Sequence, residues 1–456
     1  MSEDAKTLSR TALTDNCAFW AAVAVFAVAV LCYVNTLGAD FVNWDDPKLI
    51  LENPHVRGLT WQNLRHIWTS PIEETYLPLR ATSYAVDYHI WRGYEPMGFH
   101  LTNVILHAIN SILVLAVAAR LTRSRTAGVF AGLLFAVHPV HTEAVAWASA
   151  RKDVLSTALF LGAYLLYIRA TCAARKADVG SVVTDSCGGR VCWWSILLSL
   201  ALFVLAGLAK AMVVTLPALI ILTDVIFQDV GGGRWKKLLP VWASYFAAAA
   251  FITWIAVQFA SSAGAIRPWH FGGPGRTALF MTWAALFYIK TLFWPSFLSA
   301  RYPYGDSADF GVSENLVHAS PLILAAILAV VLWMLWRALN RRGKIPVPWL
   351  KAAAFGLGWV FISITPVMNI VSINVLVADR YLYLPSVGWA VAEGALLWLV
   401  WGRGEGPRTR RILAVVLCGA LVAAGAAGTI RRNRVWRDSL SLWSSVVREF
   451  PRSMHA

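Results

Sequence analysis

Long runs of apolar residues alternate with short polar segments along most of the chain. Many of the runs hold about 20 residues, the length that an α-helix needs to cross the hydrocarbon core of a bilayer. Eleven runs are expected to span a membrane: residues 18–37, 98–119, 126–143, 154–170, 193–209, 211–228, 238–260, 318–336, 349–369, 384–402 and 412–430. The pattern therefore predicts an all-α polytopic membrane protein with about 11 transmembrane helices in one membrane-embedded domain, residues 1–430.

Three further segments complete the expected layout. Thr277–Trp294 is a twelfth apolar run, but its flanking segments look external, so we expect it to lie along the membrane interface or to re-enter. Residues 38–97 form the largest segment between two runs, and their Trp and Tyr residues suit the headgroup region. They are expected to make a large first extracytoplasmic loop that caps a cavity. Residues 431–450 show the apolar spacing of one amphipathic helix.

The composition agrees with a membrane protein, because 58% of the residues are hydrophobic and only 14% are charged. A net charge of +15 is also compatible with nucleic-acid binding. However, the basic residues gather in short clusters between apolar runs, which favours a role in membrane topology. Five clusters are assigned to the cytoplasmic side, near residues 120–125, 169–190, 234–237, 337–344 and 403–411. This assignment places the N-terminus inside and the C-terminus outside.

Two adjacent carboxylates, Asp45 and Asp46, follow the first apolar run in "FVNWDDPKLILENP". An acidic side chain at this boundary is placed to act as a general base on a hydroxyl that arrives from water. Asp before Pro47 is also common in turns. The residues alone leave both interpretations open.

Several stretches share a pattern: "NWDDPKLILENP", "YLPLRATSYAVDYHIW", "GFHLTNVILHAINSIL", "FAVHPVHTEAVAWASARKDVLS", "LAKAMVVTLPALIILTD", "ADRYLYLPSVG" and "RNRVWRDSLSLW". Together they resemble the transmembrane and tetratricopeptide-repeat-containing protein family. This family is a branch of the C-type glycosyltransferases and is related to the protein O-mannosyltransferases. The resemblance runs from about Gly38 to Arg452, and the blocks around "HPVHTE" and "ADRYLYLPS" are its most specific parts.

The resemblance implies a C-type glycosyltransferase-like fold and an enzyme that takes a sugar, mannose or another hexose, from a polyprenyl-phosphate donor. The acceptor is expected to be a Ser or Thr hydroxyl of an exported protein or peptide. Transfer is expected to invert the configuration at the anomeric carbon of the sugar. The membrane is a bacterial inner membrane or one of the endoplasmic-reticulum type, with the active site on its extracytoplasmic side. Besides donor and acceptor, the expected partners are membrane lipids, with no nucleic acid. Residues 431–456 are expected to begin an extracytoplasmic tetratricopeptide-repeat region.

On this interpretation Asp45, ahead of Asp46, is the catalytic base. Arg380 in "ADRYLYLPS" is expected to bind the donor phosphate with its forked guanidinium, and the Tyr381 ring to lie against prenyl or sugar. An interfacial anchor that pairs with lipid or with Asp379 is the alternative for Arg380. No cofactor is expected. A divalent ion held by both aspartates is possible but not favoured, since the donor carries one phosphate rather than a diphosphate.

The block "HPVHTE" contributes His138, His141 and Glu143 as candidate substrate-binding residues. Contact with the donor phosphate or the acceptor, hydrogen bonding at the interface, and a zinc site all remain open for the histidines, although Pro139 breaks the helical spacing that a zinc pair on one helix would need. We expect no metal there.

Four more side chains are candidates for substrate binding. Lys152 is a second phosphate ligand, although Arg151, Lys152 and Asp153 are expected to neutralise one another in part. Lys210 either contacts substrate or extends to the headgroups. His100 heads a stripe with Asn103, His107 and Asn110 on one helix face, which is expected to face other helices or a wet cavity. Arg80, with Asp87, is expected to organise the first loop, either at the site or as a structural pair.

Two other functions compete with the enzyme. A solute transporter is suggested by polar residues such as Lys210 and Asp224 inside apolar stretches. Transporters commonly show internal repeats and sites at the membrane midplane, whereas this chain shows no convincing repeat and gathers its polar residues at the outer boundary. The other alternative is a non-catalytic membrane scaffold.

Overall fold

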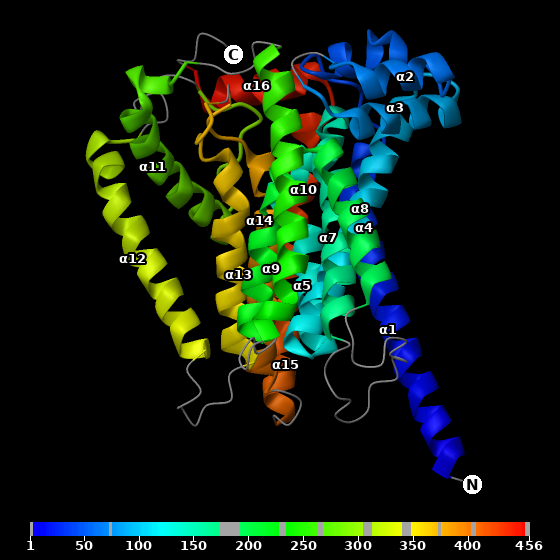
Figure 1. Ribbon diagram of the computed structural model, residues 1–456, viewed down its shortest axis with the longest axis vertical. Coiled ribbons are helices and arrows are strands. Elements are labelled where there is room, and N and C mark those ends of the chain that lie inside the picture. The colour runs from blue at the N-terminus through cyan, green and yellow to red at the C-terminus, as the bar shows by residue number, and fades with distance from the viewer. Residues whose placement is uncertain are drawn as a thin grey trace.

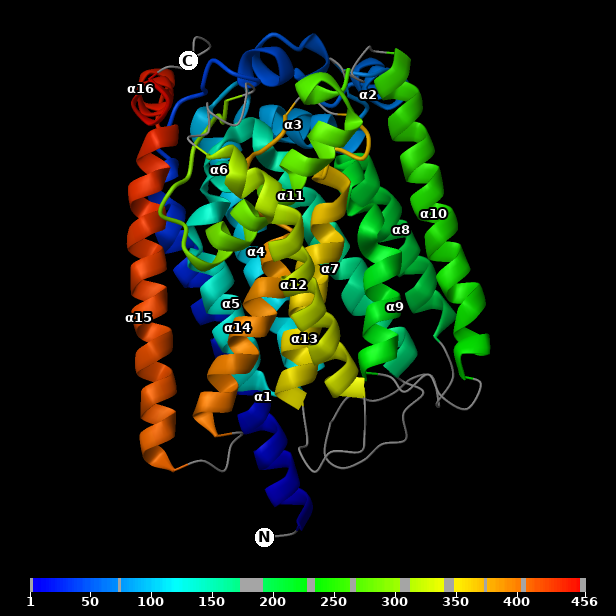
Figure 2. The same cartoon turned by 90° about the vertical axis from the view of Figure 1, so that its left-hand side faces the viewer.

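A computed structural model describes residues 3–72, 75–172, 192–227, 234–262, 268–303, 312–339, 348–372, 375–402 and 407–451. Figures 1 and 2 show a bundle of helices with a cap of shorter helices at one end. The α-helices are α1 (Glu3–Tyr33), α2 (Trp61–Thr69), α3 (Pro78–Trp91), α4 (Pro96–Thr122), α5 (Arg125–Val137), α6 (Thr142–Ala146), α7 (Arg151–Cys172), α8 (Trp193–Ala209), α9 (Leu216–Phe227), α10 (Arg234–Ser262), α11 (Pro274–Phe293), α12 (Glu314–Leu339), α13 (Pro348–Ile364), α14 (Pro385–Trp401), α15 (Arg408–Asn433) and α16 (Ser439–Glu449). The described residues form no β-strand, only an isolated bridge between Ile72 and Thr75. The expected all-α class is confirmed.

Each of the 11 runs overlaps a helix, but not every helix is long enough to cross a bilayer by itself. Among the described residues, seven helices are long and apolar enough. An eighth span would be the pair Arg125–Val137 and Pro139–Ala146, which is bent by 51°. The count of 11 crossings is therefore not confirmed, whereas an integral membrane protein is.

The bend between α5 and α6 comes from Pro139. Proline has no backbone N–H and disfavours helical backbone at the preceding residue. His138 accordingly has extended backbone, and a short 3₁₀ turn, η4 (Pro139–His141), leads into α6. The break lets the chain after α5 run through the interior of the bundle, so that all of α6 is buried.

The twelfth run forms α11, which is not among the helices that meet the criteria for a span. In Figures 1 and 2 it stays in the upper half of the bundle and the chain after it turns back toward the same end. This placement agrees with the expectation that the segment does not cross.

The expected first loop, residues 38–97, folds as a cap. It contains α2, α3 and the turn η2 (Pro47–Leu51), and α3 packs against α4, α7 and α8. The cap and α16 lie at the end of the bundle opposite the N-terminus (Figure 1). The described helix ends beside the basic clusters, such as those of α4 and α15, lie at the other end. Residues 173–191, 340–347 and 403–406, which hold much of three basic clusters, lie outside the described residues.

Two central helices, α13 and α14, touch through glycine. A methyl group added at Gly356 would overlap the carbonyl oxygen of Gly388, and one added at Gly388 would overlap that of Gly356. Small residues allow such close backbone approach between membrane helices. The contact fixes the start of α14, and with it the short 3₁₀ turn η10 (Asp379–Leu382) that precedes it.

We therefore expect Gly356→Ala to lower the free energy of unfolding by about 1–3 kcal/mol, the usual cost of overpacking. Gly419→Ala is the matched control, because Gly419 is helical, exposed and has open space around it. It should leave stability unchanged or raise it slightly, since alanine favours helix. Thermal unfolding of the purified protein in detergent measures both. Equal midpoints for the two variants would contradict the close packing.

Candidate active site

The predicted site residues come from turns and helix starts at the capped end of the bundle. Asp45 and Asp46 follow α1, Lys210 separates α8 from the turn η6 (Ala211–Thr215), and Arg380 lies in η10. Lys152 is in the first turn of α7. The fold thus brings segments that are more than 300 residues apart in the chain to one region.

Asp46 is buried and serves as an anchor for the cap. One carboxylate oxygen accepts a hydrogen bond from the backbone N–H of Val42 (2.9 Å), and the other accepts from the N–H of Ser149 (3.0 Å) and from its hydroxyl. Burial raises the pKa of Asp46 to about 6, although these donors stabilise its charged form. With both oxygens occupied by protein donors, Asp46 fixes the acidic turn against the segment before α7.

Asp45 differs from its neighbour because it is only half-buried. Within the described part of the chain its carboxylate has no hydrogen-bond or ion-pair partner, and it interacts electrostatically with Arg80 and Lys152. A carboxylate that is held in place but not occupied is available to accept a proton. Of the two carboxylates, Asp45 is therefore the one whose oxygens are not already bonded by protein donors among the described residues.

Arg380 is buried and oriented by Glu143. The guanidinium forms an ion pair with one oxygen of Glu143, and the backbone N–H of Arg380 donates to the other oxygen (2.8 Å). The guanidinium also lies 5.6 Å from the ring centroid of Trp147 and 5.4 Å from that of Tyr381. Glu143 thus acts as the positioning partner of Arg380.

Asp379, the alternative partner considered for Arg380, is used elsewhere. It accepts a hydrogen bond from the Tyr302 hydroxyl (2.7 Å). Burial, together with the nearby Glu143 carboxylate, raises the pKa of Asp379 well above its usual range. The alternative in which Arg380 pairs with Asp379 is therefore wrong, and the charged partner of Arg380 is Glu143.

A narrow cavity lies beside Arg380, with room for about one water molecule. Its lining combines charged groups, hydroxyls and apolar side chains: Asp153, Ser156, Thr157, Lys210, Met212, Val213, Arg380, Tyr381 and Leu384. Lys210 forms an ion pair with Asp153 and lies 5.7 Å from the Tyr381 ring centroid. Lys210 thus points into the protein, so the alternative that it extends to the headgroups is wrong.

Among the predicted site residues, Lys152 and Arg80 form no ion pair with a carboxylate in the described part of the chain. The expectation that Arg151, Lys152 and Asp153 neutralise one another in part is met only by an electrostatic interaction between Lys152 and Asp153, since Asp153 forms its ion pair with Lys210 and Arg151 forms its own with Asp87. Among the described residues no hydrogen bond or ion pair occupies the Lys152 ammonium, which interacts electrostatically with Asp45, Arg80, Asp153 and Arg380. Lys152 and Arg80 both interact electrostatically with Asp45, so the region offers two cations to an anionic ligand.

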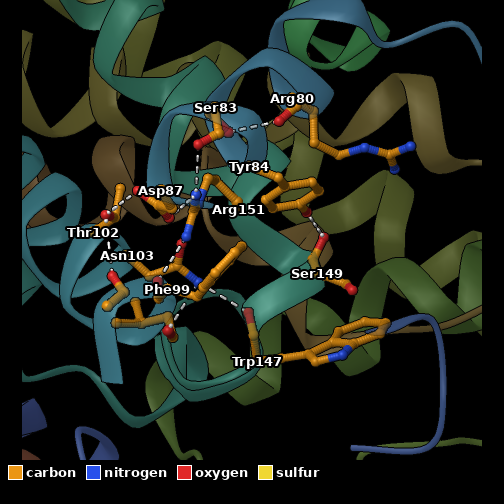
Figure 3. Close-up of polar contacts among 12 residues, drawn as sticks. Arg80, Ser83, Tyr84, Asp87, Phe99, Thr102, Asn103, Trp147, Ser149 and Arg151 are labelled. Carbon is orange, nitrogen blue, oxygen red and sulfur yellow. Dashed lines mark hydrogen bonds and ion pairs between the residues drawn. The ribbon is translucent and has the colours of Figure 1, made fainter. Parts of the chain in front are cut away.

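Arg80 reaches this site from the cap. It is buried, donates to the Thr75 hydroxyl (3.2 Å), and its Nε has no hydrogen-bond partner in the described structure. In Figure 3 its guanidinium points away from the polar network around Arg151. The sequence left open whether Arg80 acts at the site or forms a structural pair with Asp87. In the structure the cation that pairs with Asp87 is Arg151.

The histidines lie apart from the cavity lining. Nε2 of His138 lies 3.0 Å from the Leu292 carbonyl oxygen, and its Nδ1 accepts from the Val140 N–H (3.2 Å). Nε2 of His141 lies 2.7 Å from the Ser386 hydroxyl, and His100 is buried at the start of α4. Protein groups thus account for the contacts seen at His138 and His141, and substrate binding by the three stays a prediction. Among the described residues no group of three His, Cys, Asp or Glu side chains could hold a metal ion.

Interhelical contacts of the α4 stripe confirm that it faces other helices. Asn103 donates to the carbonyl oxygens of Val145 and Trp147, at 3.3 and 3.0 Å. His107 and Asn110 both contact the Tyr383 hydroxyl, at 2.8 and 3.0 Å.

Sequence reasoning missed the structural importance of Arg151. Figure 3 shows its guanidinium at the centre of a buried network between the cap, α4 and α7. It forms an ion pair with Asp87 and donates to Asn103 Oδ1 (2.9 Å) and to the backbone carbonyl oxygens of Phe99 (2.7 Å) and Ser83 (3.3 Å). The guanidinium also lies 5.0 Å from the Tyr84 ring centroid. The "ARKD" motif holds one arginine, one lysine and one carboxylate in a row, and nothing in it indicates that Arg151 pairs with Asp87.

Comparison with curated proteins confirms the resemblance. Protein O-mannosyl-transferase Tmtc1 of Drosophila melanogaster is 26% identical over 508 residues, which covers 92% of this chain and 57% of that protein. Protein O-mannosyl-transferase TMTC4 of Homo sapiens is 24% identical, covering 95% and 62%. A shorter match to Protein O-mannosyl-transferase Tmtc2 of Drosophila melanogaster is 41% identical over 151 residues, 31% of this chain and 16% of that protein. The chain thus spans about six tenths of the length of the relatives that it matches end to end. No protein-family model matches it.

Among solved structures, the chain is similar to the apo oligosaccharyltransferase of Archaeoglobus fulgidus. The TM-score is 0.54 at 14% identity, and the match covers 91% of this chain and 56% of that one. This likeness shows the fold, which is that of the C-type glycosyltransferases, as the resemblance implied.

We expect Arg151→Ala to destabilise the protein by about 3–5 kcal/mol, because it leaves the buried Asp87 carboxylate without its cation. Arg151→Lys should recover only part of this loss, since an ammonium cannot reproduce the forked contacts to Asn103 and Phe99. The control is Arg437→Ala, which removes an exposed arginine paired with Asp438 and should cost at most about 1 kcal/mol. Thermal unfolding in detergent compares the three. If Arg151→Ala unfolded like the control, the network would not hold the cap.

Proposed function

We propose that the chain transfers a sugar from a polyprenyl-phosphate donor to a hydroxyl acceptor. The observation that supports this most is that Lys152 and Arg80, which have no ion-pair partner among the described residues, interact electrostatically with Asp45, while Lys152 also interacts with Arg380 at the cavity. Lys152 interacts electrostatically with both Asp45 and Arg380 and so connects the acidic turn with the cavity. A base and a cationic phosphate site thus adjoin one another.

The charges suit a displacement at the anomeric carbon of the sugar. Asp45 accepts the proton of the acceptor hydroxyl while the hydroxyl oxygen bonds to that carbon. The bond from the carbon to the phosphate oxygen breaks on the opposite face, so the configuration inverts and polyprenyl phosphate leaves with its electron pair. The negative charge that develops on the phosphate is stabilised by Lys152, by Arg80 and by the guanidinium N–H groups of Arg380 that do not contact Glu143.

Mannose as the sugar, and a Ser or Thr hydroxyl of an exported protein as the acceptor, form part of the proposal because the curated relatives are named protein O-mannosyl-transferases. The extracytoplasmic location of the site is supported by the described helix ends beside the basic clusters, which lie at the opposite end of the bundle. Residues 1–430 form the membrane-embedded transferase domain in this proposal. Residues 431–456, which include α16, begin an extracytoplasmic repeat region.

Asp45→Asn should lower sugar transfer by at least about 100-fold, because an amide cannot act as a general base. The measurement is mass spectrometry of hexose on Ser and Thr of exported proteins, from cells that carry the wild-type chain, Asp45→Asn or no chain. Asp40→Asn is the control, since Asp40 is exposed in the same loop. Wild-type hexose levels with Asp45→Asn at equal expression would refute the assignment. Solute uptake by reconstituted protein without consumption of lipid-linked sugar would favour a transporter instead.

Lys152→Gln should raise the KM for the polyprenyl-phosphate sugar by about tenfold or more, because one charge-assisted hydrogen bond to phosphate is lost. Lys152→Arg keeps the charge and should recover most of the affinity, and Lys290→Gln, at an exposed position of α11, should have no effect. Initial rates against donor concentration with purified protein give these values. An unchanged KM for Lys152→Gln would remove Lys152 from the phosphate site.

A further inference from the structure

An open groove on the cap is separate from the candidate active site. Its lining holds two arginines, a histidine and a tyrosine from two segments of the cap, with one apolar side chain: Arg57, Gly58, Tyr88, His89, Ile90 and Arg92. None of these lining residues is acidic. Both arginines and His89 are exposed, and Nε of Arg57 donates to the Tyr94 hydroxyl (3.0 Å), which fixes the guanidinium at the groove.

Helix polarity explains only part of this positive charge. His89 and Arg92 lie at the C-terminal end of α3, where a cation offsets the helix dipole. Arg57 comes from a different segment, and no acidic residue lines the groove to balance it. The concentration of cations from two segments is therefore complementary to an anion.

The groove lies where the chain enters the membrane. Arg92 precedes by four residues Pro96, the first residue of the α4 span. Figure 1 shows α2 and α3 extending sideways past the helices beneath them. Headgroup phosphates occupy this level of a bilayer.

An apolar stripe continues from the groove toward the hydrocarbon core. On α3, Ile90 is 62% exposed although it lines the groove. On α4, exposed apolar side chains recur on one face at Met97, Ile105 and Ile109. A cationic groove above an exposed apolar stripe is complementary to a molecule with an anionic head and an apolar tail.

We propose that this groove binds the headgroup of an anionic phospholipid, whose acyl chain follows the exposed stripe of α4. Arg57 and Arg92 donate hydrogen bonds to the headgroup phosphate, and Ile90 and Met97 contact the first methylenes of the chain. This lipid site does not depend on the proposed transfer reaction.

The full-length protein, purified in a neutral detergent, is titrated with dioleoyl phosphatidylglycerol, and its thermal unfolding midpoint is followed. A ligand of the folded state raises the midpoint in a saturable manner. We expect this for phosphatidylglycerol and not for dioleoyl phosphatidylcholine, which has the same chains and no net charge. Glycerol phosphate alone is expected to have no effect. An equal response to phosphatidylcholine would overturn the need for charge, and a response to glycerol phosphate, or to an acidic peptide in place of the lipid, would overturn the lipid as occupant.

Two variants and one control locate the binding. Arg57→Gln combined with Arg92→Gln should require at least about tenfold more phosphatidylglycerol for the same shift. Ile90→Glu keeps both arginines and places a carboxylate in the groove, so it should weaken binding as well, and it tests the site even if the double variant fails to fold. Arg65→Gln removes one positive charge from an exposed position of α2 outside the groove and should behave as wild type. A wild-type response in the folded groove variants would overturn the proposal.

Discussion

The pairing of charges in a water-poor interior determines which charged side chains of this protein remain available to bind a ligand. A buried charge is costly unless an opposite charge and hydrogen bonds compensate it. Three cations at or beside the candidate site meet this condition: Arg151 with Asp87, Lys210 with Asp153, and Arg380 with Glu143. Within the described part of the chain Lys152 and Arg80 have no ion-pair partner, and both interact electrostatically with the carboxylate of Asp45.

The three ion pairs also hold the parts of the site together, because each joins separate segments of the chain. Arg151 and Asp87 tie the cap to α7, Lys210 and Asp153 tie the end of α8 to α7, and Arg380 and Glu143 tie η10 to α6. Asp46 adds a fourth connection, from the acidic turn to Ser149. Asp45 and Arg380 are thus positioned relative to each other by these four connections, and not by a direct contact between them.

Much of the fold followed from apolar periodicity, since each of the 11 runs became a helix and the first loop became a cap. The number of crossings did not follow, because a run such as 126–143 contains Pro139, and composition does not show how far the chain bends there. The neighbourhood of Asp45 and Arg380 was expected only through family resemblance, as no periodicity relates residues so far apart. Even so, helix geometry argues against neutralisation within "RKD", because neighbours one and two positions apart do not face each other on a helix. What no local rule supplies is the partner of each charge, since Asp87, Glu143 and Lys210 lie 57 to 237 residues from theirs.

Lys152 and Arg80, which lack an ion-pair partner among the described residues, favour the binding of an anion. Their mutual repulsion and partial burial raise the free energy of the folded protein without a ligand, and a bound phosphate removes that cost. A neutral residue in place of Lys152 would avoid this cost, whereas the charged side chains that line the cavity, Asp153, Lys210 and Arg380, each have an ion-pair partner. An anion that binds beside these two cations offsets that cost, and in the proposed reaction the phosphate of the lipid-linked sugar would be this anion.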